Sequence, residues 1–154
     1  MALQKPQPPH QVGGKPAAAP PATMPKVVEE VVAVPTDEKE LGMTAKEPEV
    51  NKLFRMVMKF EASDLHLKVG QPPMMRLRGD IRRTDMRKIT QEDMERLLLP
   101  HLKPNHRKIL EEEGGVDFSY VVGNDEARFR VSLFKQRGRL SLVSRRVNSI
   151  IPTF

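Results

Sequence analysis

Three stretches late in the chain alternate apolar and polar residues, and this pattern constrains the fold more than any other feature. They are VDFSYVV (116–122), EARFRVSLFKQ (126–136) and RLSLVSRRV (139–147). A Gly-Asn-Asp turn separates the first two and a Gln-Arg-Gly turn the last two, and short turns of this kind join antiparallel strands. Because successive side chains of a strand point to opposite faces, the pattern predicts an antiparallel sheet with one buried face.

The residues upstream predict helices and further strands. A helix over 50–62 carries Leu53, Phe54 and Val57 on one face and Arg55 largely on the opposite, polar face. The remaining expected elements are a strand over 63–69, a strand over 74–84 with a kink or turn at Gly79-Asp80, a helix over 90–102 with Thr90 as its N-cap, and a short helix over 103–115. The order of helix, two strands, two helices and three strands indicates an α+β domain, an antiparallel sheet flanked by helices.

The first 49 residues have a different composition. Nine of the 14 prolines lie in the first 48 residues, and bulky apolar residues are rare in KPQPPHQVGGKPAAAPPATMPK (5–26). Such a segment cannot bury enough apolar surface to offset the entropy lost on ordering. We therefore predict a disordered, Pro/Ala-rich tail over 1–49 and a folded domain over 50–152. Within the tail, KVVEEVVAV (26–34) is the exception: it forms a short strand or helix that docks on a partner, or it stays mobile.

The charge of the chain is concentrated in the expected domain. Residues 51–154 contain 21 Lys and Arg against 13 Asp and Glu. A domain this basic suggests an anionic partner, which is a phosphate, a nucleic acid or a membrane. A solvated basic surface is the alternative reading of the same charge.

Several common sites are missing from the sequence. It contains no cysteine, no G-x-x-x-x-G-K-[ST] loop, no G-x-G-x-x-G after a strand and no H-E-x-x-H pair. No apolar run approaches the roughly 20 residues that span a bilayer. We expect no metal site and no complete nucleotide site in this chain, and we expect it to lack ATPase activity by itself.

The arginines are the strongest functional signal. In the strand over 126–136, Arg128 and Arg130 share the face opposite to Phe129. The turn at 136–138 brings the next strand back beside them, and with it Arg145 or Arg146. Planar guanidinium groups gathered on an open sheet face suit phosphate oxygens. Cross-strand pairing with a carboxylate is the alternative, although Asp117 can serve only one of these arginines.

Two strings in this sequence together resemble a known family. ASDLHLKVGQPPMMRLRGDIRR (62–83), with its S-D-L-H-L, and DFSYVVGNDEARFRVSLFKQRGRLSLVSRRV (117–147), with R-F-R-V, Q-R-G and R-R, look like the N-terminal domain of type IV pilus retraction ATPases. These are the twitching-motility members of the type II/type IV secretion ATPase superfamily. The resemblance covers about residues 50–152.

The resemblance implies a fold, partners and a site. It implies a PAS-like fold, a P-loop ATPase domain following in the same chain, and a homo-hexameric ring that uses ATP and Mg. Carried over by position, Arg130 and Arg145 contact the ATP phosphates, with a one-residue ambiguity between Arg145 and Arg146. Arg137 or Arg139 in the turn is a third candidate.

Further expectations concern the location of the protein in the cell and whether the chain is part of a longer protein. We expect a cytoplasmic protein that meets the inner-membrane platform protein of the pilus and is thereby peripheral at the inner membrane, without direct nucleic-acid binding. The P-loop is absent here, so we expect an excised part of a longer ATPase rather than a stand-alone domain. The alternatives are a small basic nucleic-acid-binding module, with Phe118, Tyr120 and Phe134 as candidates for base stacking, and an adaptor that docks on a pilus ATPase ring.

In the first string, the leucines are expected to face the core. Asp64 is placed to accept a hydrogen bond from an amide or an arginine, while His66, Arg76 and Arg78 face the other way. That second face is the one we expect a ring neighbour to cover.

Overall fold

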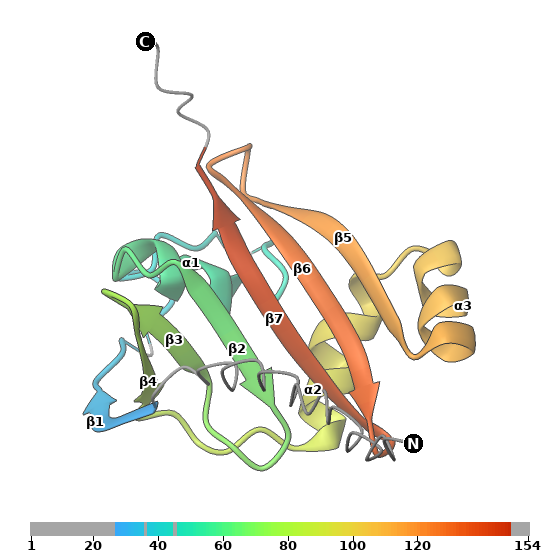
Figure 1. The fold of residues 1–154 in the computed structure, drawn as a ribbon. Helices are drawn as coiled ribbons and strands as arrows, with labels where there is room; N and C mark the ends of the chain where they lie inside the picture. Colours follow the sequence, from blue (N-terminus) through green and yellow to red (C-terminus); the bar gives the residue numbers. More distant parts are fainter. Residues whose placement is uncertain (1–26, 36, 45, 149–154) are drawn as a thin grey trace, which may run out of the picture.

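Seven strands form one sheet in the computed structural model, which describes residues 27–35, 37–44 and 46–148. Along the sheet the strands follow the order β1-β4-β3-β2-β7-β6-β5. All neighbours are antiparallel except β1 and β4, which are parallel. In Figure 1, α1 and α2 lie behind the sheet and α3 lies beside β5.

The elements have the following bounds. The strands are β1 (Val27–Val32), β2 (Asp64–Lys68), β3 (Met74–Leu77), β4 (Asp80–Thr84), β5 (Gly115–Val122), β6 (Ala127–Gln136) and β7 (Arg139–Val147). The helices are α1 (Asn51–Lys59), α2 (Gln91–Leu98), the 3₁₀ turn η1 (Leu99–His101) and α3 (Pro104–Glu113). The predicted α+β class is confirmed.

The core lies between the sheet and the helices. Alternate residues of the central strands point into it, including Leu65 and Leu67 of β2 and Phe129, Val131 and Leu133 of β6, all of them buried. Helix α1 adds its apolar face to the same cluster. The apolar residues that repeat every second position in the strands therefore pack against those that repeat with the helical period in α1, and together they form one core.

Local chemistry explains where several elements begin and end. Thr90 caps α2 as predicted: its Oγ1 accepts a hydrogen bond from the Asp93 amide at 3.2 Å, and the Asp93 carboxylate accepts one from the Thr90 amide at 3.0 Å. This reciprocal pair is a capping box. Gly114 ends α3 in the left-handed conformation. The predicted kink in the strand over 74–84 is a turn at Arg78-Gly79 that separates β3 from β4.

Order begins earlier in the chain than the sequence predicted. Strand β1, in the stretch expected to dock or to stay mobile, pairs with β4, and the segment after it buries Val34 and Leu41 in the core. The Asp85 amide donates to the Val32 carbonyl at 3.0 Å, and the Val34 amide donates to the Asp85 carboxylate at 3.0 Å. In the described residues of this segment (27–35, 37–44 and 46–49) the chain is therefore placed against the domain rather than apart from it, because a paired strand and apolar residues such as Val34 and Leu41 hold it there. Residues 1–26 lie outside the described part of the chain.

None of the helices in the described ranges is long and apolar enough to cross a bilayer.

Candidate functional site

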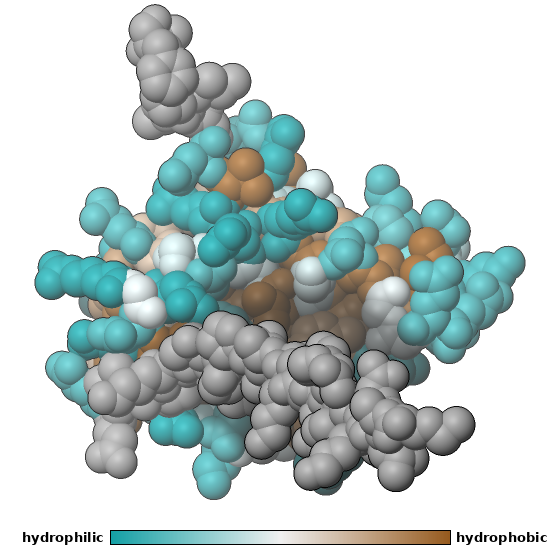
Figure 2. Space-filling model, in the orientation of Figure 1, coloured by the Kyte–Doolittle hydropathy of each residue, from teal (hydrophilic) through white to brown (hydrophobic). Residues whose placement is uncertain are grey.

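The sheet face opposite the helices carries the arginines that the sequence singled out. Strand register arranges its side chains in rows that cross the strands. One row is Val121, Arg128 and Val147, and the next is Ser119, Arg130, Arg145, Asp64 and Arg76. We call Arg76, Arg128, Arg130 and Arg145 the arginine face. Figure 2 looks onto this side of the molecule and shows hydrophilic side chains, with apolar patches between them, over the upper part of the sheet.

Arg130 and Arg145 lie directly opposite each other on β6 and β7. Side chains in such a pair start about 5 Å apart, and like charges at that distance repel. Arg130 is exposed, and no carboxylate lies within 4 Å of it among the described residues. An anion bound between the two guanidinium groups would relieve this repulsion.

Asp64 holds two members of the arginine face in place. Its buried carboxylate lies 3.3 Å from the Arg145 Nε and 3.0 Å from the Arg76 Nε, and the Ser63 hydroxyl donates to it at 2.8 Å. The bond to Arg145 uses only Nε, and the Arg145 side chain is 75% exposed. Among the residues in the described ranges, none is hydrogen-bonded to its terminal nitrogens, which are therefore accessible to a ligand. The predicted role of Asp64 as an acceptor for an arginine is confirmed.

His66 lies on the same face, two residues along β2 from Asp64, as the sequence predicted. Burial lowers the pKa of His66, while the nearby Asp64 carboxylate opposes this shift and Arg76 adds to it. Burial thus favours the neutral form of the imidazole. Arg78 does not share the face, because it occupies the turn between β3 and β4.

The register separates Arg145 from Arg146. Arg146 is paired with the buried Phe129, so it belongs to the helix side of the sheet. Arg145 is therefore the residue that shares a face with Arg130.

The structure does not bring the turn arginines to this site. Arg139 precedes Arg145 by six residues along β7, and six residues of a strand span about 20 Å. Arg137 lies in the turn beyond it. Arg137 and Arg139 are thus too far away to share a phosphate with the Arg130–Arg145 pair on a rigid sheet.

Carboxylates and aromatic residues are sparse on the arginine face. Asp117 accepts a hydrogen bond from Ser132 rather than from an arginine, and Arg128 lies 3.6 Å from Asp125 of the preceding turn. The register puts Phe118 and Tyr120 on the helix side, opposite Val131 and Phe129 of β6. Both aromatic residues pack against the core there.

A buried ion-pair network was missed by sequence reasoning. Arg55, predicted on the polar face of α1, is only 6% exposed and binds two carboxylates. Its Nε and Nη2 donate to Glu47 at 2.8 and 2.6 Å, and its Nη1 and Nη2 donate to Glu126 at 2.9 and 3.1 Å. The Arg55 guanidinium lowers the pKa of Glu47 to about 2 and the carboxylates raise the pKa of Arg55. Helical periodicity gives no sign of this network, because Glu126 is 71 residues away in the sequence.

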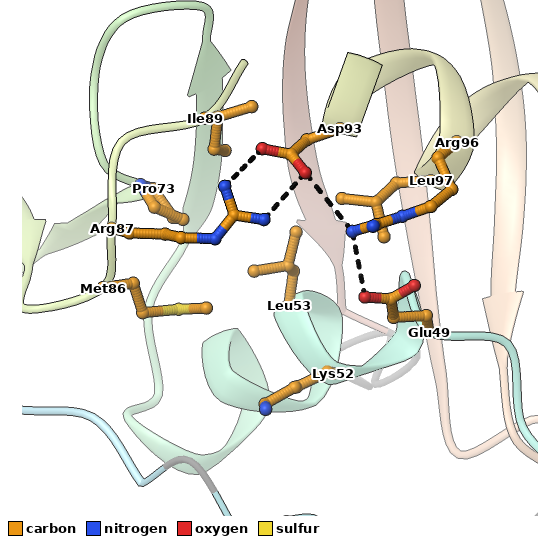
Figure 3. A pocket seen from close by; sticks show the side chains of 10 residues that line it. All are labelled: Glu49, Lys52, Leu53, Pro73, Met86, Arg87, Ile89, Asp93, Arg96 and Leu97. Atoms are coloured by element: carbon orange, nitrogen blue, oxygen red, sulfur yellow. Dashed lines mark hydrogen bonds and ion pairs between the residues drawn. The ribbon is translucent and has the colours of Figure 1, made fainter. Parts of the chain in front are cut away.

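A small pocket of about 220 Å³ lies between α1, α2 and the segment after β4 (Figure 3). Its apolar lining includes Leu53, Ile89 and Leu97, and ion pairs cross its rim. Arg87 donates to both Asp93 oxygens at 2.6 and 2.8 Å. Because Asp93 also completes the capping box of α2, these charges are engaged in local structure.

No family model matches this sequence. Among curated proteins, the type IV pilus retraction ATPase PilT of Pseudomonas aeruginosa is 35% identical over 105 residues, which are 68% of this chain and 30% of PilT. The type IV pilus ATPase PilU of the same organism is 30% identical over 105 residues, 68% of this chain and 27% of PilU. A crystal structure of the pilus retraction motor PilT with bound ADP superposes with a TM-score of 0.60 at 34% identity, covering 70% of this chain and 31% of that one.

The domain is an N-terminal domain of the pilus retraction ATPase family. The resemblance read from the two sequence strings is thereby confirmed. This chain spans less than a third of the length of PilT and PilU.

Proposed function

We propose that this family domain serves an ATP-driven motor of a type IV pilus or a related secretion system by supplying arginines that sense the nucleotide phosphates. Arg130 and Arg145 would reach across a cleft to ATP and Mg held by a C-terminal P-loop domain. The proposal includes a homo-hexameric ring, a PAS-like fold for this domain, cytoplasmic placement and contact with the pilus platform protein at the inner membrane. That the related PilT structure contains ADP supports a nucleotide as the ligand.

The observation that carries the proposal is the Arg130–Arg145 pair. Two guanidinium groups lie opposite each other, and Asp64 orients one of them through Nε while its terminal nitrogens stay exposed. Negative charge grows on the phosphates during phosphoryl transfer, and an oriented guanidinium stabilises that charge. The domain itself has no P-loop, so its arginines would complete a site that another domain builds.

The test is the steady-state ATPase rate of the hexamer that contains this domain. Arginine fingers in other phosphoryl-transfer enzymes contribute about 10³- to 10⁵-fold in rate. If part of the proposed role of these arginines is to couple domain closure to ATP, the effect is smaller, and we expect Arg130→Ala to lower turnover by at least about tenfold. Arg130→Lys should recover little of it, since a lysine keeps the charge but loses the planar fork.

Arg145 and Arg146 provide the matched comparison. They are adjacent on β7 but belong to opposite faces, so Arg145→Ala should lower turnover as Arg130→Ala does, whereas Arg146→Ala should change it less than about twofold. Circular dichroism of each variant checks that the domain is folded. If a folded Arg130→Ala hexamer kept the wild-type turnover, the proposal would be refuted, and the arginine face would be only a solvated basic surface.

The nucleic-acid reading receives less support from the geometry. Stacking of bases requires exposed aromatic rings beside the cations. Phe118 and Tyr120 are on the opposite side of the sheet, and Phe134 pairs with Ser141, four residues along β7 from Arg145. Loss of single-stranded DNA binding in Arg130→Ala, with ATPase turnover unchanged, would favour that reading instead.

A further inference from the structure

A second group of cations surrounds a hollow at the tip of the β6–β7 hairpin. The hollow has a volume of about 540 Å³, within the usual range of ligand sites. We call this cavity the hairpin hollow. The residues that line it are Lys68, Val69, Gln136, Arg137, Arg139 and Ser141. Three of these six side chains are cationic, and the arginine face is about 20 Å away along β7.

The cations of the hairpin hollow lie apart from the carboxylates of the part of the chain that the structure describes. Among the described residues, no carboxylate lies within 4 Å of the charged groups of Lys68, Arg137 or Arg139. The lining itself contains no Asp or Glu. This differs from the rim of the α1–α2 pocket, where every arginine is paired. Three uncompensated cations at one hollow leave a local positive potential that attracts an anion.

Regular backbone structure fixes the positions of these groups. Lys68 and Ser141 are register partners on β2 and β7, and Gln136 and Arg139 close the hairpin. The turn between them is made by Arg137 and Gly138, both with positive φ, which is typical of a tight two-residue hairpin turn. The cations therefore project from a sheet end whose backbone is already ordered, so a ligand would not have to order it.

From this geometry we infer that the hairpin hollow binds a phosphate group with more than one negative charge, at a site distinct from the arginine face. A single carboxylate would neutralise one of the three cations. A phosphomonoester or polyphosphate carries two or more charges and several acceptor oxygens, which match two guanidinium forks and an ammonium. Gln136 and Ser141 add neutral donors to the wall. The same chemistry is offered by a soluble polyphosphate and by the headgroup of an anionic phospholipid.

An amide NMR titration of this chain with sodium tripolyphosphate tests the inference, because it reports each site separately. We expect the Gly138 and Lys68 amides to shift with a common dissociation constant. Arg137→Gly/Arg139→Gln should weaken that constant by at least about tenfold, the loss of two charged contacts. Glycine accepts the positive φ of position 137, so the turn is kept. Lys68→Gln, on a different strand, should weaken binding in the same direction.

The chain offers a matched control. Arg78-Gly79 forms a second Arg-Gly turn with positive φ at both residues, between β3 and β4. Arg78→Gly/Lys88→Gln removes the same charge and also changes a turn arginine to glycine. It should change the constant by less than about twofold, because neither residue lines the hollow. Equal weakening in this control, no response of the hollow amides in the wild type, or an unchanged dissociation constant in Arg137→Gly/Arg139→Gln would overturn the inference.

Co-sedimentation with vesicles identifies the source of the phosphate. One set contains phosphatidylcholine alone and the other contains phosphatidylcholine with phosphatidic acid, whose headgroup is a phosphomonoester. Binding to the second set that is lost in Arg137→Gly/Arg139→Gln supports a lipid headgroup at the hollow. Tripolyphosphate binding that is lost in this variant without any vesicle binding supports a soluble ligand.

Discussion

Replacing Arg55 by methionine should destabilise the domain through the carboxylate that it leaves behind. Arg55 ties three separate parts of the fold together: the segment before α1 through Glu47, α1 itself, and the turn before β6 through Glu126. Methionine keeps much of the length of the side chain and removes the charge and the donors. The Glu47 side chain is only 11% exposed, so water cannot fully replace the lost partner.

The magnitude follows from the pKa of Glu47. A fall from 4.5 to about 2 corresponds to between about 3 and 4 kcal/mol at about 1.4 kcal/mol per pKa unit, and Arg55 is the largest of its causes. The Glu126 side chain is 47% exposed, and its pair adds less than about 1 kcal/mol. The methionine also recovers some apolar packing. We therefore expect Arg55→Met to lower the free energy of unfolding by about 2–3 kcal/mol at neutral pH, near the lower end for a broken buried pair.

The pH dependence distinguishes this cause from a simple packing defect. Because folding lowers the pKa of Glu47, its contribution is fully present above pH 4.5 and is lost as the pH falls toward about 2. The difference between wild type and Arg55→Met should thus be constant above about pH 5 and shrink below it.

Urea unfolding followed by circular dichroism, at neutral pH and in steps below pH 4.5, measures both quantities. Glu126→Gln is the control, with an expected loss below about 1 kcal/mol. A loss below about 1 kcal/mol for Arg55→Met at neutral pH, or a difference that does not narrow in acid, would refute the reasoning.

Two further predictions concern α2 and β2. Thr90→Ala should lower the free energy of unfolding by about 1 kcal/mol in the same urea assay, because it removes the acceptor for the Asp93 amide, and Thr90→Ser should recover most of the loss. Burial lowers the pKa of His66, so the unfolded chain binds the proton more readily and stability should fall as the pH drops below 6.5. His66→Gln should flatten the dependence of the thermal midpoint on pH in that range. If the slope were unchanged, groups other than His66 would cause the pH dependence.

The helices and strands that the sequence predicted are those in which apolar residues repeat at a regular interval without interruption. The last three strands, α1 and α2 were predicted because their apolar residues repeat at intervals that only one regular structure satisfies. Strand β1 was left open because VVEEVV is short and follows a proline-rich segment, and its pairing with β4 depends on residues more than fifty positions away. Local patterns contain no information on such distant partners.

In the candidate site, too, the residues placed by local patterns were predicted and those placed by distant contacts were not. Arg130 and Arg145 were predicted because alternation and one hairpin turn suffice to place them opposite each other. Arg137 was grouped with them on the basis of the resemblance, but strand length separates it from them by about 20 Å. The burial of Arg55 was not predictable from α1 alone, since it requires Glu47 and Glu126 from two other segments.

The parallel pairing of β1 with β4 has a consequence for the order of folding. The antiparallel strand pairs β3–β4, β5–β6 and β6–β7 each close over a short turn, whereas β1 and β4 are separated in the sequence by α1, β2 and β3. Closing a loop of that length costs more chain entropy than closing a hairpin. Strand β1 is also an edge strand with a single partner and an irregular register, so it should separate from the sheet more readily than the hairpin strands do. The edge of β4 is then uncovered in partially open molecules while the arginine-bearing hairpin remains intact.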